Sequence, residues 1–224
     1  MAPSQKSSII VVSAPSGTGK TTLIHKLLEK HKEIDFSVSH TTRGIRQGET
    51  NGVDYHFISK DQFQKKIDSD EMLEWANVFG NLYGTSKKEI ERISANGHRV
   101  VLDIDVQGWE QAKEKIPEAM SVFILPPSLK CLWDRLEGRG TDSFEVRWRR
   151  LLTAKKEIEK GYLYHHYIIN DDLSGAYQEL ESIAINGQAG KIKPEEGIKI
   201  CKALINEFDT ASWLYELKKK ATSK

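Results

Sequence analysis

The chemically most suggestive stretch of the sequence is a short run rich in glycine and hydroxyl side chains that ends in Gly-Lys-Thr. Its members are Ser13, Ala14, Pro15, Ser16, Gly17, Thr18, Gly19, Lys20, Thr21 and Thr22. Glycine lets the backbone come close to a ligand, so that successive N–H groups can converge on phosphate oxygens. Lys20 is then placed to reach the β and γ phosphates of a nucleoside triphosphate, and the Thr21 hydroxyl to ligate Mg²⁺.

One position of this run departs from the general phosphate-loop pattern GxxxxGK[ST], because Ala14 replaces the first glycine. Alanine has the smallest side chain, which limits the consequence. The alternative interpretation is an ordinary glycine-rich turn between a strand and a helix. Gly-Lys-Thr on the first turn of a predicted helix favours the phosphate loop, which indicates a triphosphate but not its acceptor.

Two aspartates, Asp103 and Asp105, close a second apolar run, residues 99–102. A carboxylate at the end of a buried strand is where a magnesium-orienting acid lies in phosphate-loop folds. The alternative is that either aspartate caps a turn between a strand and a helix.

The elements that must position these residues follow from the apolar pattern. The β-branched run at residues 9–12 predicts a strand buried on both faces, and residues 99–105, 121–125 and 167–170 have the same character. Helical spacing begins at Thr21, and helices rich in Leu and Lys separate the later strands. The alternation predicts an α/β class with a doubly wound parallel sheet flanked by helices.

The sequence pattern changes at residues 36–97, which predicts an inserted antiparallel subdomain. Residues 36–39 and 55–58 are typical of short strands, joined by a turn region at 44–52.

Composition narrows the class of protein. Lys and Arg number 33 against 32 Asp and Glu, so the net charge of +1 does not favour a nucleic-acid-binding protein. The two cysteines, Cys131 and Cys201, are too far apart for a metal-binding motif and are expected to be reduced. No apolar run reaches the length of a signal segment or membrane span, so we expect no membrane partner and a cytoplasmic location.

Several motifs in order along the chain resemble the guanylate kinase family, in its bacterial type. Besides residues 13–20, they are Ser37-Val38-Ser39-His40-Thr41-Thr42-Arg43-Gly44-Ile45-Arg46-Gln47-Gly48-Glu49, Gly52-Val53-Asp54-Tyr55, Phe79-Gly80-Asn81-Leu82-Tyr83-Gly84-Thr85, Leu102-Asp103-Ile104-Asp105-Val106-Gln107-Gly108, Ile124-Leu125-Pro126-Pro127-Ser128, Arg135-Leu136-Glu137-Gly138-Arg139-Gly140 and Ile169-Asn170-Asp171-Asp172. The resemblance covers residues 7–185. Residues 188–224 form an additional C-terminal extension, for which we predict two helices.

The resemblance implies a phosphate-loop (P-loop) kinase core at about residues 7–35 and 98–185, with a GMP-binding insertion at about 36–97. A mobile helical lid is expected at about 138–161. The implied reaction moves the γ-phosphoryl group of ATP to GMP or dGMP by in-line transfer, with Mg²⁺ as cofactor. The implied partners are therefore the small molecules ATP and GMP or dGMP; monomer and homodimer both stay open.

The resemblance also implies the acceptor site. Arginine's planar fork suits a phosphate dianion, and a carboxylate can accept hydrogen bonds from guanine N1–H and N2–H₂. The implied GMP-binding residues are Ser39, Arg43, Arg46, Glu49, Tyr55, Glu74, Tyr83, Thr85 and Asp105, with Glu74 as the guanine reader. Taken singly, each has a plainer interpretation as a solvated charge, a turn hydroxyl or a packing aromatic; their joint occurrence after a phosphate loop favours the site.

On the donor side, the resemblance implies that Arg135, Arg139 and Asn170 join residues 13–22 in binding ATP. The implied catalytic residues are Lys20, Arg43, Arg139 and Arg150. For the metal, Thr21 is the implied Mg²⁺ ligand, with Asp103 acting through water.

The predicted lid departs from the family pattern at Phe144, Arg147 and Trp148, which affects the register of its arginines. We interpret Arg147 and Arg149 as a solvated helix face, and expect Trp148 to pack against the added tail.

Two other functions share part of this pattern. A ribose bisphosphate phosphokinase has the phosphate loop but needs no guanine reader, and Glu74, Ser39 and the pair Arg43 and Arg46 argue against it. Guanylate-kinase-like modules of scaffold proteins bind phosphopeptides without catalysis, but they typically lose the phosphate loop, which is intact here.

Overall fold

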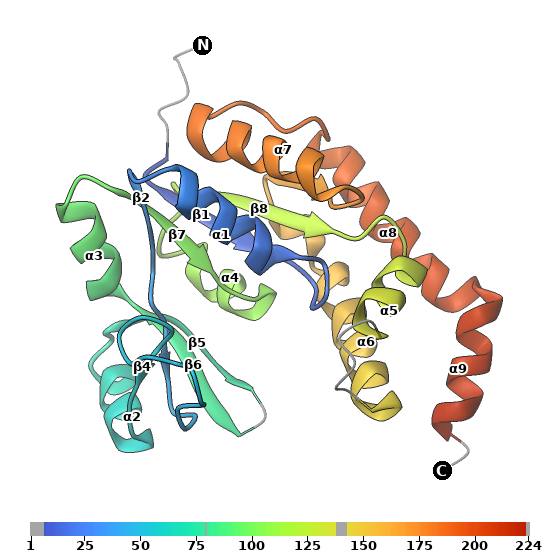
Figure 1. Ribbon diagram of the computed structural model, residues 1–224, viewed down its shortest axis with the longest axis horizontal. Helices are drawn as coiled ribbons and strands as arrows, with labels where there is room; N and C mark the ends of the chain where they lie inside the picture. The colour runs from blue at the N-terminus through green and yellow to red at the C-terminus, as the bar shows by residue number, and fades with distance from the viewer. Residues whose placement is uncertain (1–6, 79, 138–142, 223–224) are drawn as a thin grey trace. The chain divides into compact units, whose positions relative to one another are not determined.

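The computed structural model describes residues 7–78, 80–137 and 143–222, except the side chains of residues 220 and 222 (Figure 1). The chain forms two compact units. We call Val12–Leu27 with Ser121–Lys224 the phosphate-loop unit, and Ser7–Val11 with Leu28–Met120 the strand-rich unit. Strand β1, Ile9–Ser13, begins in the strand-rich unit and ends in the other.

Parallel strands form one part of the strand-rich unit. Strand β2, Ile34–Phe36, pairs in parallel with β7, Arg99–Asp103, and β1 is the next neighbour of β7. The side chains of Val100, Val101 and Leu102 on β7 are fully buried, as the continuous apolar run predicts.

A four-stranded sheet forms the other part of this unit, in the order β4-β3-β6-β5. Its strands are β3, His40–Thr41, β4, His56–Phe57, β5, Met72–Val78, and β6, Asn81–Ser86. The pairings of β3 and β5 with β6 are antiparallel, as predicted for this stretch, but β3 and β4 pair in parallel.

The predicted strand at residues 36–39 is wrong. Phe36 ends β2, and Ser37 still donates its N–H to Val101 O at 3.0 Å. The N–H of Val38 is instead taken by the Glu89 carboxylate at 3.4 Å, so the chain leaves the parallel ladder here. It enters the smaller sheet at His40.

Three helices of the strand-rich unit begin at side-chain caps. In α2, Lys60–Asp68, Ser59 and Gln62 form a reciprocal capping box. In α3, Lys87–Ala95, Ser86 accepts from the N–H of Glu89, and in α4, Val106–Ala112, Asp105 is the cap.

The phosphate-loop unit contains α1, Lys20–Lys30, whose apolar residues Leu23, Ile24 and Leu27 are buried at the predicted spacing. Strand β8, Met120–Leu125, pairs in parallel with β9, His166–Ile169. The other elements are α5, Leu129–Glu137, α6, Phe144–Glu159, the 3₁₀ helix η1, Gly161–Leu163, and α7, Leu173–Asn186, which packs on β9. These parallel pairs and covering helices confirm the predicted α/β class.

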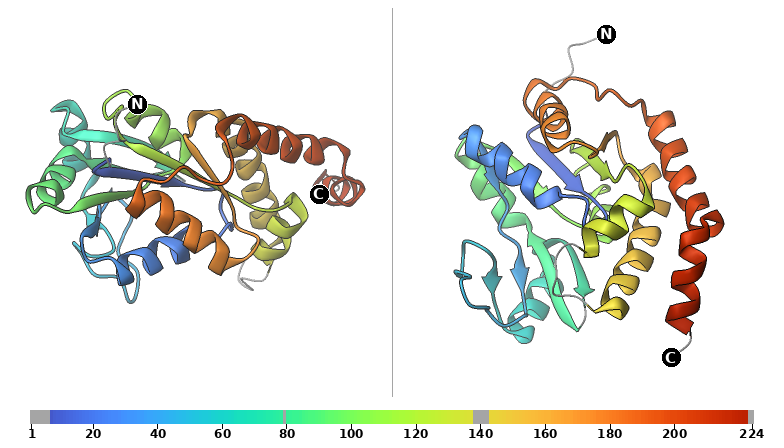
Figure 2. Two further views of the ribbon diagram at one scale, coloured as in Figure 1. Left: turned by 90° about the horizontal axis from the view of Figure 1, so that it is seen from above. Right: turned by 45° about the vertical axis from the view of Figure 1, so that its right-hand side comes forward.

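The C-terminal extension forms the two predicted helices. Helix α8, Pro194–Thr210, contacts β9, η1 and α6, and α9, Ser212–Thr222, follows it (Figure 2). Cys201, Leu204 and Phe208 of α8 and Leu214 of α9 are buried. The extension is therefore packed into the phosphate-loop unit.

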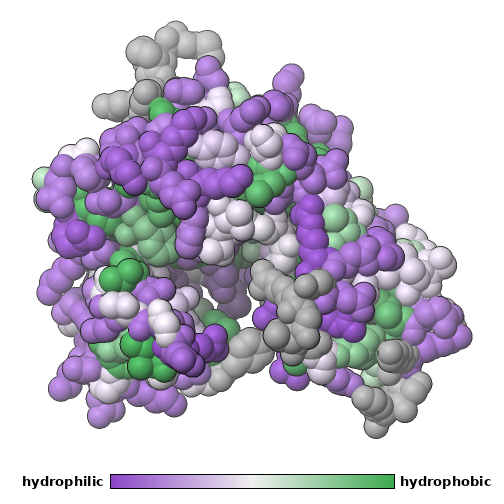
Figure 3. Space-filling view, in the orientation of Figure 1, coloured by the Kyte–Doolittle hydropathy of each residue, from purple (hydrophilic) through white to green (hydrophobic). Residues whose placement is uncertain are grey.

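Polar side chains dominate the face drawn in Figure 3, with small apolar areas between them. Within residues 7–78, 80–137 and 143–222, none of the helices has the length and apolar character needed to cross a bilayer.

Candidate active site

The phosphate loop lies between β1 and α1. Gly17 and Gly19 have φ angles of 96° and 91°, a left-handed region that residues with a Cβ rarely adopt. Between them, Thr18 donates its N–H to Pro15 O at 3.2 Å and its hydroxyl to the same oxygen at 2.6 Å. The loop therefore turns sharply on backbone geometry that these two glycines permit.

Replacement of the first glycine by Ala14 is accommodated without backbone strain. Among the described residues other than glycine, only Asp70 has a positive φ, so Ala14 adopts a conformation open to any L-residue. Its side chain is buried, with 6% of its surface exposed. The departure seen in the sequence therefore does not distort the loop.

Asn170 contacts the loop directly. Its Nδ2 donates to Thr18 O at 2.6 Å, and a Cβ placed on Gly19 would lie 2.6 Å from the same nitrogen. The Arg135 guanidinium in turn donates to Asn170 O at 2.8 Å. The structure thus brings two of the predicted ATP-binding residues together: Asn170 supports the loop backbone, and Arg135 holds the backbone of Asn170.

Helix α5 covers the other side of the loop. A Cβ on Gly17 would lie 3.0 Å from Leu136 Cδ2 and 3.2 Å from Leu132 Cδ1. The sequence analysis did not include these leucines among the site residues, because their helical spacing is equally typical of ordinary core packing.

The last three loop residues open α1. Lys20 is half-buried, while Thr21 and Thr22 are exposed on the first turn of the helix. The N-terminal end of a helix favours anions, because its first N–H groups have no acceptor within the helix.

In the strand-rich unit, Glu74 and Thr85 face each other across β5 and β6. Glu74 is buried, with 5% of the residue's surface exposed. Its carboxylate oxygen Oε1 accepts the Thr85 N–H at 2.8 Å. Gly108 of α4 lies against the second oxygen, since a Cβ there would be 2.7 Å from Glu74 Oε2. Glycine at position 108 leaves space for the carboxylate, a role that the sequence analysis missed although Gly108 belongs to a matched motif.

The pKa of Glu74 is raised to about 7, chiefly by burial and then by the nearby charge of Asp105, while hydrogen bonds from Thr85 oppose the shift. Lys115 lies close enough to lower this pKa, and its ammonium donates to Leu73 O at 2.7 Å. A carboxyl group with a pKa near neutrality in a buried position is typical of a functional site.

Arg43 and Glu49 form a two-point ion pair, with nitrogen-to-oxygen distances of 2.7 and 3.0 Å. Glu49 also accepts the Arg46 N–H at 2.8 Å. The guanidinium of Arg43 lies 5.5 Å from the Tyr55 ring centre, and hydrogen bonding to Glu49 and then Tyr83 raises its pKa. Arg43 thus contacts three predicted GMP-binding residues, Glu49, Tyr55 and Tyr83, and Arg46 joins them through Glu49, whose pKa the Arg43 guanidinium lowers.

A small cavity of about 120 Å³ is lined by two predicted GMP-binding residues, Ser39 and Tyr55, and by Asp103, which was predicted to act on the metal through water. Phe36 and Asp54, which the sequence analysis did not select, also line it. Burial raises the pKa of the Tyr55 phenol, so this hydroxyl stays protonated and able to donate.

Asp105 has the capping role that the sequence left open as an alternative. Its Oδ1 accepts the Gly108 N–H at 2.8 Å and caps α4. The capping bond holds Gly108 against Glu74, so Asp105 influences the Glu74 carboxylate through both structure and charge.

On the predicted lid helix α6, the interpretation of Arg147 as solvated is wrong. Its guanidinium pairs with Glu137 and lies 4.9 Å from the Trp133 ring centre, leaving 15% of the side chain exposed. Arg149 is exposed, as predicted, and Arg150 is half-buried. The predicted catalytic residue Arg139 lies outside the described residues.

The two aromatic departures of the lid also have packing partners. Phe144 meets Trp133 of α5 edge-on at 5.9 Å between ring centres. Trp148 packs on Phe208 of α8 at 6.2 Å, which confirms the expected contact with the added tail.

Comparisons with known proteins agree in one family. The family model described as guanylate kinase matches residues 6–186. Guanylate kinase of Neisseria meningitidis serogroup A is 50% identical over 183 residues, covering 82% of this chain and 89% of that protein. Guanylate kinase of Carboxydothermus hydrogenoformans is 44% identical, covering 85% and 92%. The crystal structure of guanylate kinase from Anaplasma phagocytophilum superposes with a TM-score of 0.65 at 32% identity, covering 84% and 89%.

Proposed function

This chain belongs to the guanylate kinase family, and from that premise we propose how its residues divide the work of phosphorylating GMP with ATP. The reaction is a nucleoside monophosphate kinase reaction that yields ADP and GDP. Phosphoryl transfer asks little covalent chemistry of the protein, so catalysis comes from in-line positioning and neutralisation of charge.

The backbone of residues 14–21 binds the ATP phosphates, and Lys20 neutralises charge on the β and γ groups. The positive φ angles of Gly17 and Gly19 shape the loop for this role. The first turn of α1 adds N–H groups that can bind the phosphates. Asn170 and Arg135 hold the loop in shape through the contacts with Thr18 O and Asn170 O. Their predicted contacts with ATP itself remain part of the proposal.

Mg²⁺ accompanies ATP and supplies electrostatic stabilisation of the phosphoryl group. Each residue by itself suits such a hard cation, since Thr21 of the phosphate-loop unit offers an exposed hydroxyl and Asp103 of the strand-rich unit offers a carboxylate oxygen. We assign Thr21 as the ligand and Asp103 as the acid that acts through water.

On the acceptor side, the GMP phosphate is bound by two arginines and two tyrosines, Arg43, Arg46, Tyr55 and Tyr83. On GMP binding, the Arg43 guanidinium either leaves Glu49 for the phosphate or binds both groups at once. It can bind both because it has five N–H donors. Glu74 reads the guanine N1–H and N2–H₂ edge, and Ser39 and Thr85 complement it near O6. Asp105 orients this cluster through its cap on α4.

Arg150 on α6, with Arg139, supplies positive charge to the transferring group. Closure of a lid over the substrates also excludes water, which competes with GMP as acceptor.

The observation that carries this assignment is the buried Glu74 carboxylate with one oxygen held by Thr85 and space left by Gly108 at the other. A coupled ADP-release assay with GMP, dGMP, AMP, CMP, UMP and ribose bisphosphate tests it. We expect turnover with GMP and dGMP and none with the other acceptors.

Lys20→Met should abolish turnover without unfolding the protein, whereas Lys26→Met, on the exposed face of α1, should not change it. Turnover with ribose bisphosphate, or full activity of Lys20→Met, would contradict the assignment. A folded protein that binds neither ATP nor GMP in calorimetry would contradict it as well.

We propose a cytoplasmic location on the basis of two free thiols, Cys131 and Cys201. Burial raises the pKa of Cys201 to about 12, which makes it an unreactive packing residue.

Sedimentation of the purified chain would decide between monomer and homodimer.

A further inference from the structure

The C-terminal extension lies beyond residue 186, where the match to the family ends, yet α8 is tightly fitted to the family's own elements. The backbone of Gly197 in α8 lies directly against the Tyr167 ring of β9, which a Cβ at this position would overlap. Gly161 of η1 likewise leaves no space for a Cβ beside Cys201. Two glycines, one on each partner, thus allow the closest approach between α8 and the neighbouring elements.

Helix α8 then reaches the predicted lid helix α6. Phe208, 3% exposed, packs on Trp148, and the Lys155 ammonium lies 4.9 Å from the Phe208 ring centre. Lys155 also pairs with Asp209 at 3.4 Å. One turn of α8 therefore contacts α6 at two positions that lie on either side of Arg150 in the sequence.

The same turn of α8 reaches α5. Glu207 accepts the N–H of Leu129, the first residue of α5, at 3.1 Å. A carboxylate at this end of a helix satisfies a free donor and interacts favourably with the helix dipole. Helix α5 carries Arg135, which contacts the phosphate loop through Asn170.

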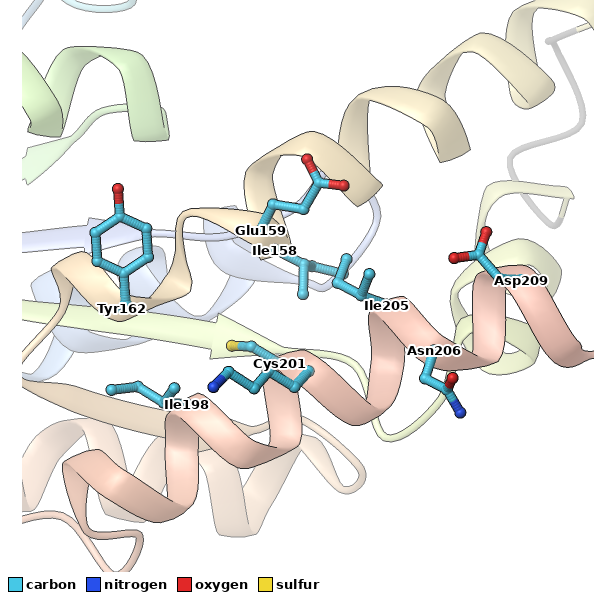
Figure 4. A pocket seen from close by; sticks show the side chains of 9 residues that line it. Ile158, Glu159, Tyr162, Ile198, Cys201, Ile205, Asn206 and Asp209 are labelled. Atoms are coloured by element: carbon cyan, nitrogen blue, oxygen red, sulfur yellow. The ribbon is translucent and has the colours of Figure 1, made fainter.

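Between these contacts, a space remains open where α8 faces α6 and η1. A cavity of about 370 Å³ lies there, lined in part by Ile158, Ile198, Cys201 and Ile205, and Figure 4 shows Ile158 near Ile205 across it. None of the predicted site residues lines this cavity. The side-chain contacts of α8 with α5 and α6 described above are made by Glu207, Phe208 and Asp209.

We propose that α8 positions α5 and α6, and through them Arg135 and Arg150, for phosphoryl transfer, with Phe208 and Glu207 as its positioning residues. This inference rests on the proposed function of the two arginines. Because neither Phe208 nor Glu207 reaches the phosphate loop in any described contact, they act through the helices that they hold. The expected consequence is an effect on the ATP side of the reaction and not on GMP binding.

Kinetics of Phe208→Ala test this expectation, with Asn206→Ala, an exposed position on the same helix, as matched control. We expect kcat/KM for ATP to fall about tenfold, since small displacements of catalytic groups are costly, while KM for GMP stays within about twofold. Phe208→Leu should recover most of the loss, and Asn206→Ala should behave as the native protein. A rise in KM for GMP as large as the loss in kcat/KM for ATP, or no loss at all, would overturn the proposal.

Hydrogen exchange gives a readout independent of activity. In ligand-free Phe208→Ala, amides of residues 144–159 should exchange about tenfold faster, and those of α2 and α3 at the native rate. Should Phe208→Ala fail to fold, Glu207→Ala, which removes one acceptor, should speed exchange at residues 129–137 about threefold. Native exchange rates in α5 and α6 of the folded variants would refute the proposed positioning role of α8. A native protein unable to phosphorylate GMP would instead refute the proposed function and leave the exchange result valid.

Discussion

The phosphate loop and the Glu74 cluster, one in each compact unit, are built on different principles. The loop is a continuous stretch whose shape depends on backbone conformation at Gly17 and Gly19 and on close approach of Asn170. The Glu74 cluster takes residues from β5, β6 and α4, and its character depends on a buried charge. The first site should be sensitive to an added atom, and the second to a changed charge or pH.

The largest effect should come from adding one methyl group to the loop in Gly19→Ala. The alanine would adopt an unfavourable φ of 91° and displace Asn170, whose nitrogen lies 2.6 Å from the new Cβ. We expect kcat/KM for ATP to fall on the order of 10³-fold, as when an oriented phosphate-binding group is lost. Steady-state kinetics with varied ATP measure it, with Gly44→Ala, where nothing lies within 4 Å, as control. An active Gly19→Ala enzyme would show that side chains, and not the backbone, determine this site.

Changing the charge without changing the shape should have the next largest effect, in Glu74→Gln. Glutamine can still accept the Thr85 N–H, but its amide presents donors toward the donors of guanine. We expect kcat/KM for GMP to fall ~10²-fold, the value of a hydrogen bond to a charged group, with little change in stability. The assay compares GMP with AMP and uses Glu91→Gln, an exposed residue of α3, as control. Unchanged preference for GMP would remove Glu74 from base recognition.

Sensitivity to an added methyl group should also hold at Gly197 of α8, away from the phosphate loop but in the same unit. Because the new Cβ would overlap the Tyr167 ring, Gly197→Ala should lower the free energy of unfolding by about 2 kcal/mol. Urea denaturation measures this change. Gly44→Ala, which has open space around it, should change the same quantity by about 0.5 kcal/mol or less. Equal stability of the two variants would mean that α8 shifts easily on β9.

The smallest effect should be the pH dependence of guanosine binding. With a Glu74 pKa of about 7, about one tenth of the carboxyl groups are ionised at pH 6 and about nine tenths at pH 8. Affinity for guanosine should therefore rise about tenfold over this range in calorimetry and level off above it. Guanosine avoids the titration of the GMP phosphate, and Glu74→Gln should give a flat profile; a flat profile in the native protein would contradict the raised pKa.

The same shift has a consequence for stability without ligand. Because the folded-state pKa of Glu74 is raised from 4.5 to about 7, the folded protein binds a proton that the unfolded chain has released between these values. This contribution to stability is present below about pH 4.5 and is lost as the pH rises through 7.

Much of the donor site was predictable because its signal is local. The order of apolar run, glycines and Lys20 lies within one strand, one turn and one helix, so backbone preferences at neighbouring positions are sufficient. The short strands around residues 36–41 were placed less well. There the chain passes from one sheet to another, and the Glu89 carboxylate, 51 residues from Val38, decides where the ladder ends.

The predicted lid helix α6 also shows that contacts between distant residues cannot be read from local sequence. A stretch with Arg147 and Arg149 is typical of a solvated face, and only for Arg149 is that interpretation correct. Arg147 is held by Glu137 and Trp133, which no spacing within α6 reveals.

By itself, the sequence determined the α/β class, the phosphate loop and the list of residues that resemble a GMP site, because these depend on neighbours along the chain and on motif order. Only the tertiary structure decided the raised pKa of Glu74, the ion pair of Arg43 with Glu49, and the docking of α8 on α5 and α6. Burial, pairing of distant charges and the fit of one surface to another arise only when remote segments meet, and residue order alone does not specify them.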